Sequence, residues 1–176
     1  MGENLPLRTR AMPEVRCEYE IWRPVVRMSE DGCVAPDGSR WLVDAWSGGD
    51  RIGSRGLDLL CDAIGTRKQG RVQYVRASAI GTGTAALGTP QGKGLGSAVY
   101  HGTVPYTKPA TTGSWQMNRS YSIGSTYAMK ESGLFVGTRK DALLRGTMYS
   151  RGTFAVRNVV SGDTITLNYR CGFTSG

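Results

Sequence analysis

Two segments of the chain alternate apolar and polar residues with the period of two that is typical of a half-buried strand. The first spans residues 15–21, where arginine and glutamate fill the polar positions, and the second spans residues 164–173. We expect one face of each strand to lie against a core. The apolar members are Val15, Cys17, Tyr19 and Ile21 in the first segment, and Ile165, Leu167, Tyr169, Cys171 and Phe173 in the second.

A turn signal precedes the C-terminal segment. Phe154, Val156 and Val160 mark another strand, and Ser-Gly-Asp at residues 161–163 forms a short turn in which glycine permits positive φ. We therefore expect this strand to pair antiparallel with residues 164–173 as a hairpin.

A second hairpin is predicted further upstream. Leu-Phe-Val at residues 134–136 and the run 143–149 flank the turn-forming residues 137–141. Another strand is expected over residues 72–80, where it ends at the Gly-Thr-Gly-Thr run of residues 81–84.

Apolar residues at positions i, i+3, i+4 and i+7 predict one short helix over residues 57–64. Ser54 can cap its N-terminus, and Gly65 suits the left-handed position that ends a helix. A helix of about three turns is marginal by itself, so we expect it to dock on the sheet. Its apolar face consists of Leu57, Leu60, Cys61 and Ile64.

Two regions lack this periodicity. Residues 1–14, with two prolines, are expected to form an extended arm, and residues 85–126, rich in Gly, Ser and Thr, a long irregular loop. The sequence therefore predicts a mainly β protein: an antiparallel β-sandwich with one short docked α-helix and an extended N-terminal arm. Residues 15–176 are expected to form a single β-rich domain.

Composition is consistent with this class. A chain of 176 residues fits one domain that can bury a core, and its 25 glycines argue against long helices. No run approaches the ~18 apolar residues of a membrane span, and residues 1–6 lack the apolar stretch of a signal peptide, so we expect no membrane association and no leader.

The net charge of +8 is unevenly distributed. Residues 1–56 hold eight Lys and Arg against nine Asp and Glu, a net −1, whereas residues 57–176 hold fourteen against five, a net +9. This basic part indicates an acidic partner, either an acidic protein surface or nucleic acid, or else a solvated basic face. The basic residues are dispersed, which favours the solvated face or a protein neighbour.

Residue types for catalysis or metal binding are sparse. His101 is the single histidine, and the four cysteines (Cys17, Cys33, Cys61 and Cys171) are widely spaced without a C-x-x-C pair, which argues against zinc. We expect Cys33 to be exposed and the others to lie on apolar faces, with disulfides as the less favoured alternative. Their redox state is left open.

Other candidate sites are weak. The glycine-rich run 88–94 resembles a phosphate-binding loop, but its glycines are one residue too close and Gly94 replaces the hydroxyl that would bind Mg²⁺. Glu131, Asp141 and Asp163 are separate carboxylates beside predicted turns, and no feature joins them as an acid/base pair. We therefore expect no catalytic, cofactor-binding or metal-binding residues.

Aromatic and basic residues interleave at residues 74–76 and at residues 115–121, which include Trp115, Arg119 and Tyr121. Such interleaving is typical of surfaces on which single-stranded nucleic acid stacks. We favour the alternative interpretation, in which Tyr74 packs in the sheet and Trp115 anchors the loop.

The order of segments from about residue 54 resembles a family of tailed-bacteriophage virion structural proteins, described variously as head decoration, neck or tail-fibre-like. The resemblance covers about 120 residues, and residues 1–53 show no family pattern. It implies a non-enzymatic component of the particle exterior, assembled in the cytoplasm of a host bacterium. The motifs that carry it are Gly-Leu-Asp-Leu-Leu at 56–60, the turn at 80–84, Glu-Ser-Gly-Leu-Phe at 131–135, and Gly-Asp-Thr-Ile-Thr-Leu at 162–167.

These observations together favour a capsid decoration or cement protein that binds neighbouring virion subunits, the major capsid protein or neck and tail proteins, and that forms homo-oligomers. We expect the contact regions in residues 1–14 and 85–126. Alternatives are a neck, collar or tail accessory protein, a basic nucleic-acid-binding module, and a hydrolase of cell-wall glycan, for which no acid/base constellation is found. The position in the particle is left open.

Overall fold

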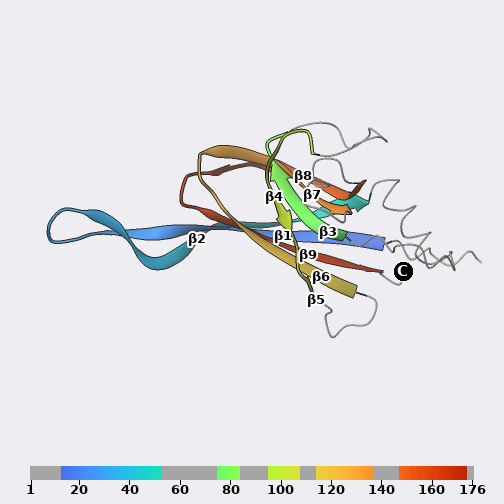
Figure 1. Ribbon diagram of the computed structural model, residues 1–176, viewed down its shortest axis with the longest axis horizontal. Coiled ribbons are helices and arrows are strands. Elements are labelled where there is room, and N and C mark those ends of the chain that lie inside the picture. The colour runs from blue at the N-terminus through green and yellow to red at the C-terminus, as the bar shows by residue number, and fades with distance from the viewer. Residues whose placement is uncertain (1–12, 53–74, 84–94, 108–113, 137–146, 174–176) are drawn as a thin grey trace, which may run out of the picture.

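The computed structural model describes residues 13–52, 75–83, 95–107, 114–136 and 147–173 (Figure 1). Within these ranges the chain forms nine strands and no helix, so the expectation of a mainly β, antiparallel protein is confirmed. The helix predicted at residues 57–64 lies outside the described ranges. The strands are β1 (Pro13–Met28), β2 (Val34–Ile52), β3 (Val75–Gly81), β4 (Ala98–Thr103), β5 (Tyr106–Thr107), β6 (Ser114–Ser122), β7 (Tyr127–Val136), β8 (Thr147–Val159) and β9 (Thr164–Phe173).

The strands form two antiparallel sheets. Strands β5-β6-β9-β1 make the first sheet and β4-β3-β7-β8 the second. Strand β2 joins them, because it pairs with β1 along most of its length and with β8 at Arg51 and Ile52. Of the hairpin predicted from residues 134–136 and 143–149, the described part is confirmed, since Phe135 lies opposite Met148 and Val136 opposite Thr147, whereas residues 137–146 lie outside the described ranges.

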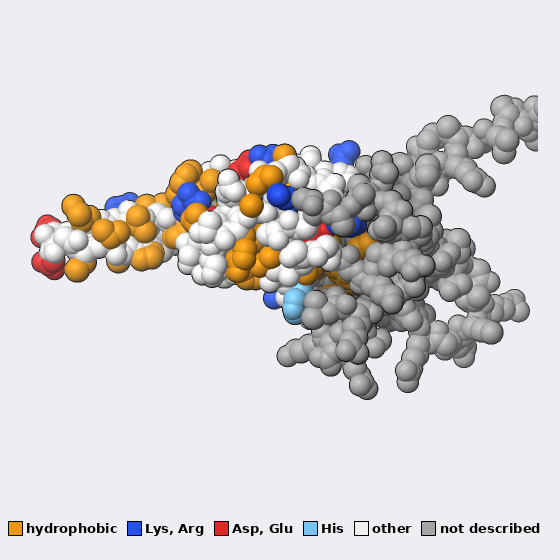
Figure 2. All heavy atoms as spheres, turned by 90° about the horizontal axis from the view of Figure 1, so that it is seen from above, with side chains coloured by type: hydrophobic (Ala, Val, Ile, Leu, Met, Phe, Trp, Pro, Cys, Tyr) orange, Lys and Arg blue, Asp and Glu red, His pale blue; other side chains and the backbone are white. Residues whose placement is uncertain are grey.

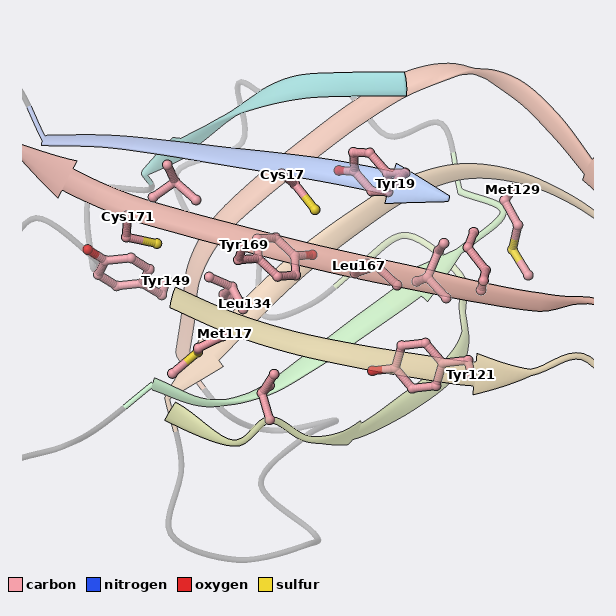
Figure 3. Close-up of a cluster of buried hydrophobic side chains, with 14 of the residues drawn as sticks. Cys17, Tyr19, Met117, Tyr121, Met129, Leu134, Tyr149, Leu167, Tyr169 and Cys171 are labelled. Atoms are coloured by element: carbon pink, nitrogen blue, oxygen red, sulfur yellow. The ribbon is translucent and has the colours of Figure 1, made fainter. Parts of the chain in front are cut away.

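One core lies between the two sheets. The inward residues of β1 and β9 are at most 2 % exposed, which confirms the alternation expected for residues 15–21 and 165–171. They pack against residues of the second sheet such as Leu134 and Val159. Figure 3 shows several of these side chains converging, among them Cys17, Tyr169 and Leu134. Burial of this apolar surface is the main favourable contribution to folding.

The turn at residues 161–163 exists, but the hairpin expected around it is wrong. Gly162 has a φ of +92°, as the turn signal predicts. However, β8 pairs with β7 and β2, whereas β9 pairs with β1 and β6, so the chain crosses from one sheet to the other at this turn. The strand marked by Phe154 and Val156 exists as part of β8, where Phe154 packs against the core and Val156 is exposed, whereas Val160 lies just after its end.

Two further expectations need correction. Residues 85–126 are not one irregular loop, because β4, β5 and β6 lie within this range, and β6 pairs with β9 along nine residues. The bounds of the arm expected over residues 1–14 are wrong at their end, because Pro13 and Glu14 pair with β9 as part of β1. Residues 1–12 lie outside the described ranges, as do residues 84–94 and 108–113.

A buried carboxylate ties a loop to the second sheet. Glu131 on β7 is fully buried, and its oxygens accept hydrogen bonds from the backbone N–H groups of Gly83, Gly96 and Ser97 at 2.9–3.1 Å. The Arg151 guanidinium on β8 lies 2.5 Å from the same carboxylate. A buried charge is tolerated when it is paired and fully hydrogen-bonded, and this one meets both conditions.

Candidate functional site

The most prominent surface feature is a two-stranded ribbon that leaves the body. Pairing of β1 with β9 stops at Trp22, whereas pairing of β1 with β2 continues to Met28 and Val34. Residues 22–42, here called the distal ribbon, therefore project from the rest of the protein (Figure 1). Six residue steps from Trp22 to Met28 at ~3.4 Å each give a projection of ~20 Å.

One face of the distal ribbon is apolar. Directly opposite residues of an antiparallel pair project from the same face, and alternate residues share a face. The register then places seven apolar side chains and one arginine together on the face that continues the outer surface of the first sheet. These are the pairs Trp22 with Leu42, Pro24 with Arg40, Val26 with Pro36, and Met28 with Val34.

Most of this face is uncovered within the described part of the chain, whereas Trp22 and Pro24 at its base are half-buried. Met28 is 74 % exposed, Val34 65 %, Val26 57 % and Leu42 45 %. Figure 2 shows hydrophobic side chains along the projection and acidic side chains at its end. Contiguous exposed apolar residues of this kind mark interaction sites, whereas scattered ones do not.

Local interactions give the ribbon its shape. The turn at its tip is closed by hydrogen bonds between Ser29 and Cys33 and by Gly32, whose φ is +78°. Further back the register shifts between Pro24 and Val26, so that β2 carries a bulge. Asp37 in the bulge accepts a hydrogen bond from the Ser39 N–H and forms an ion pair with Arg27 at 2.7 Å. Bulges bend and twist a ribbon, which directs where its face points.

The base of the ribbon is anchored to the turn between β8 and β9. Arg23 donates two hydrogen bonds to the buried carboxylate of Asp163, at 2.7 and 2.9 Å. Burial by itself raises the pKa of Asp163, but the hydrogen bonds from Arg23 and the Val160 N–H outweigh it and keep this pKa below its usual value. Arg40 also donates to the Thr164 hydroxyl. The ribbon is thus fixed where it leaves the body.

A second cluster of titratable groups lies inside the core. Burial raises the pKa of Asp50 to about 7, partly offset by a hydrogen bond from the Tyr19 hydroxyl. The Tyr19 hydroxyl lies 2.6 Å from that of Ser132. Burial also raises the pKa values of the Cys17 and Cys171 thiols, so both stay protonated and unreactive at neutral pH. A cluster closed to solvent in this way suits a structural role.

The residues considered as candidate sites in the sequence lie apart. Glu131 pairs with Arg151 and Asp163 with Arg23, whereas Asp141 and the glycine-rich run 88–94 lie outside the described ranges. His101 is exposed on β4. Among the described residues, no three His, Cys, Asp or Glu side chains are grouped so that they could hold a metal ion.

The cysteine predictions are borne out where they can be observed, whereas the expectation that Trp115 anchors a loop is wrong, and Tyr74 lies outside the described ranges. Cys33 is exposed at the ribbon tip, and Cys17 and Cys171 are buried and unpaired, whereas Cys61 lies outside the described ranges. Trp115 lies in β6, where its ring packs 6.1 Å from that of Tyr149. Arg119 stacks over Tyr121 at 5.5 Å. This segment therefore belongs to the sheet and its core.

The distal ribbon is not predicted by the pattern of apolar and polar residues. Its strands lose the simple alternation of residues 15–21, because neither face packs on a core. Two signals were present, the Asp-Gly pairs at residues 31–32 and 37–38, which mark the tip and the bulge.

Comparison of the chain with protein-family models, with curated proteins and with solved structures found no match. In the part of the chain that the structure describes, no helix has the length and apolar character needed to cross a membrane.

Proposed function

We propose that this protein is a non-enzymatic structural component of a tailed-bacteriophage particle, and specifically a capsid decoration or cement protein that binds neighbouring virion subunits. The observation that carries the proposal is the distal ribbon, a ~20 Å projection with an uncovered apolar face. A projection of this kind suits contact with a neighbouring subunit. The resemblance of residues 54–167 to virion proteins supports the part of the proposal that places this neighbouring subunit in a phage particle.

The body has the properties of a scaffold. Two antiparallel sheets around one core, which we interpret as a β-sandwich, hold the ribbon in a fixed direction. In the described residues, the buried carboxylates Glu131 and Asp163 are each paired with an arginine, an arrangement suited to holding strands together. Residues 57–176, with a net charge of +9, would face an acidic shell surface.

Binding to particles tests this function. Particles of the encoding phage assembled without this protein are mixed with the purified chain and sedimented. We expect saturable co-sedimentation that weakens as salt rises, because exposed charges are screened. Absence of binding to particles would contradict the proposal. Binding to tailless heads separates a decoration protein from a neck or tail accessory protein.

A nucleic-acid-binding module is the second candidate, because the same basic segment could contact phosphates. It predicts tight binding of the purified chain to DNA, with a steep loss of affinity as salt rises. If the protein is a decoration protein, the purified chain should bind phage heads more tightly than it binds DNA at the same ionic strength.

A further inference from the structure

We infer that the distal ribbon is the self-association arm of this protein, and that its apolar face docks on a second copy of the same chain in a reciprocal exchange of ribbons. This inference deepens the proposed function and depends on it, because it identifies the neighbouring subunit that the distal ribbon contacts as a second copy of this chain. It rests on three properties of the ribbon: its area, its charge and its open edges.

The apolar area of the distal ribbon indicates that two copies exchange their ribbons. Four exposed side chains of the apolar face, Val26, Met28, Val34 and Leu42, offer on the order of 300 Å² of apolar surface. A stable interface needs ~800 Å² from each partner. One ribbon on a flat surface falls well short of this area. Two copies that exchange ribbons double the apolar contact, and they add the surface on which each ribbon lies.

The charge identifies the partner surface. The tip carries Glu30 and Asp31, both exposed, and Figure 2 shows this acidic end. Residues 57–176 carry a net charge of +9. A second copy therefore supplies both the apolar ribbon and a basic segment of chain, residues 57–176, that attracts the acidic tip. An anionic lipid surface would repel the same tip.

The edges of the ribbon allow a strand to be added. Among the described strands, β1 beyond Trp22 pairs with β2 alone, and β2 between Val34 and Asp50 pairs with β1 alone. Backbone N–H and C=O groups along both outer edges are therefore open to a neighbouring strand. Proteins use such edges for recognition through backbone hydrogen bonds.

Sedimentation velocity of the full chain at several concentrations tests the inference. The test variant combines Val26→Thr, Met28→Thr and Val34→Thr, which keep strand propensity and remove apolar surface that no described residue covers. The matched control combines Val156→Thr and Val160→Thr, which are exposed valines on and just after β8. We expect the wild-type chain and the control to associate alike, and the ribbon variant to associate at least tenfold more weakly.

Cross-linking gives a second measurement. Carbodiimide joins carboxylates to lysines in contact, and mixing isotope-labelled with unlabelled chains identifies the links formed between copies. We expect links from Glu30 or Asp31 of one copy to lysines in residues 57–176 of another, such as Lys130. A wild-type chain that stays monomeric, or a ribbon variant that associates like the wild type, would overturn the inference. A monomer that still binds particles through its ribbon would assign the ribbon to another virion protein.

Discussion

The Arg23 guanidinium on β1 holds the Asp163 carboxylate with two hydrogen bonds, at 2.7 and 2.9 Å, across 140 residues of chain. Arg23 lies at the base of the distal ribbon, and Asp163 lies in the turn where the chain crosses between the sheets. The Asp163 carboxylate also accepts a hydrogen bond from the Val160 N–H, and the Ile123 N–H donates to the Asp163 backbone carbonyl. The pair therefore links the projecting surface to the body.

Replacing Arg23 by alanine should lower the free energy of unfolding by about 1–3 kcal/mol, because it leaves a buried carboxylate without its partner. The expected loss is below that for a fully buried pair, since Arg23 is 32 % exposed. Chemical denaturation at pH 7 measures it. The matched control is Arg170→Ala, which removes an exposed pair with Glu18 and should change stability by less than ~1 kcal/mol. Equal losses in the two variants would contradict the anchoring role of Arg23.

The Arg23 effect should depend on pH. Because the folded pKa of Asp163 lies below its usual value, the pair stabilises the folded protein above pH ~4, and this contribution is lost as the pH falls through the folded pKa. The stability difference between wild type and Arg23→Ala should therefore shrink in acid. Denaturation curves of both proteins between pH 2 and 7 (roughly the range over which carboxylates titrate) check this expectation.

Asp50 should produce a pH dependence of the opposite sign. Burial raises its folded pKa to about 7, so the unfolded chain loses this proton at lower pH than the folded protein does. Stability should fall between pH ~4 and ~7, by an amount on the order of 4 kcal/mol from this group. Asp50→Asn should flatten this slope and be more stable than wild type above pH ~7.

Asp44→Asn serves as the control for Asp50, because Asp44 lies on the same strand but is one-third exposed and paired with Arg157. It should keep the wild-type slope. A slope that persists in Asp50→Asn would show that another group causes the pH dependence.

Gly83 should not tolerate a side chain. A Cβ there would lie 2.2 Å from Glu131 Oε1 and 2.7 Å from the Ser97 backbone nitrogen, the two atoms that are joined by the hydrogen bond from Ser97 to Glu131. We expect Gly83→Ala to destabilise the protein by about 1–3 kcal/mol, as overpacking does. Gly49→Ala on β2, with no atom within 4 Å of its Cβ, should change thermal stability little. Similar melting temperatures for the two variants would contradict the close approach at Gly83.

Glu131→Gln should be the most destabilising of these substitutions, by about 3–5 kcal/mol, because the Arg151 charge then stays buried without a partner. The side-chain amide introduced at position 131 would also place its NH₂ group, a hydrogen-bond donor, against backbone N–H groups that are donors themselves. Hydrogen exchange at the amides of Gly83, Gly96 and Ser97 should accelerate. The control is Glu18→Gln, whose exposed partner Arg170 gives a weak ion pair, and exchange at these amides should stay unchanged.

The sequence pattern predicts the strands that have one face buried against the core and one face exposed to water. Val15 to Ile21 and Ile165 to Cys171 alternate because one side of each meets the core and the other meets water. In β6 the same signal is weakened, because Arg119 occupies the face of the buried residues Met117 and Tyr121. This explains why that strand was expected to be part of a loop.

Other features depend on tertiary contacts that local patterns do not encode. Gly162 predicts a turn, but the sequence of this turn does not determine whether the next strand pairs with β8 or crosses to the other sheet. Burial of Glu131 with Arg151 is similarly invisible in the sequence, since such charges are usually exposed. The distal ribbon escaped prediction because it packs on no core, and that exposure makes it the candidate site.

Antibody labelling of whole particles tests the central claim most directly. Under the proposed function, particles of a phage that encodes this protein are incubated with gold-labelled antibody against it, beside particles that lack it, and are imaged by electron microscopy. The account predicts gold distributed over the head surface of normal particles and none on the deficient ones. Gold confined to the neck or tail would reject the decoration role, and normal particles without gold on any part would contradict a structural role on the virion exterior.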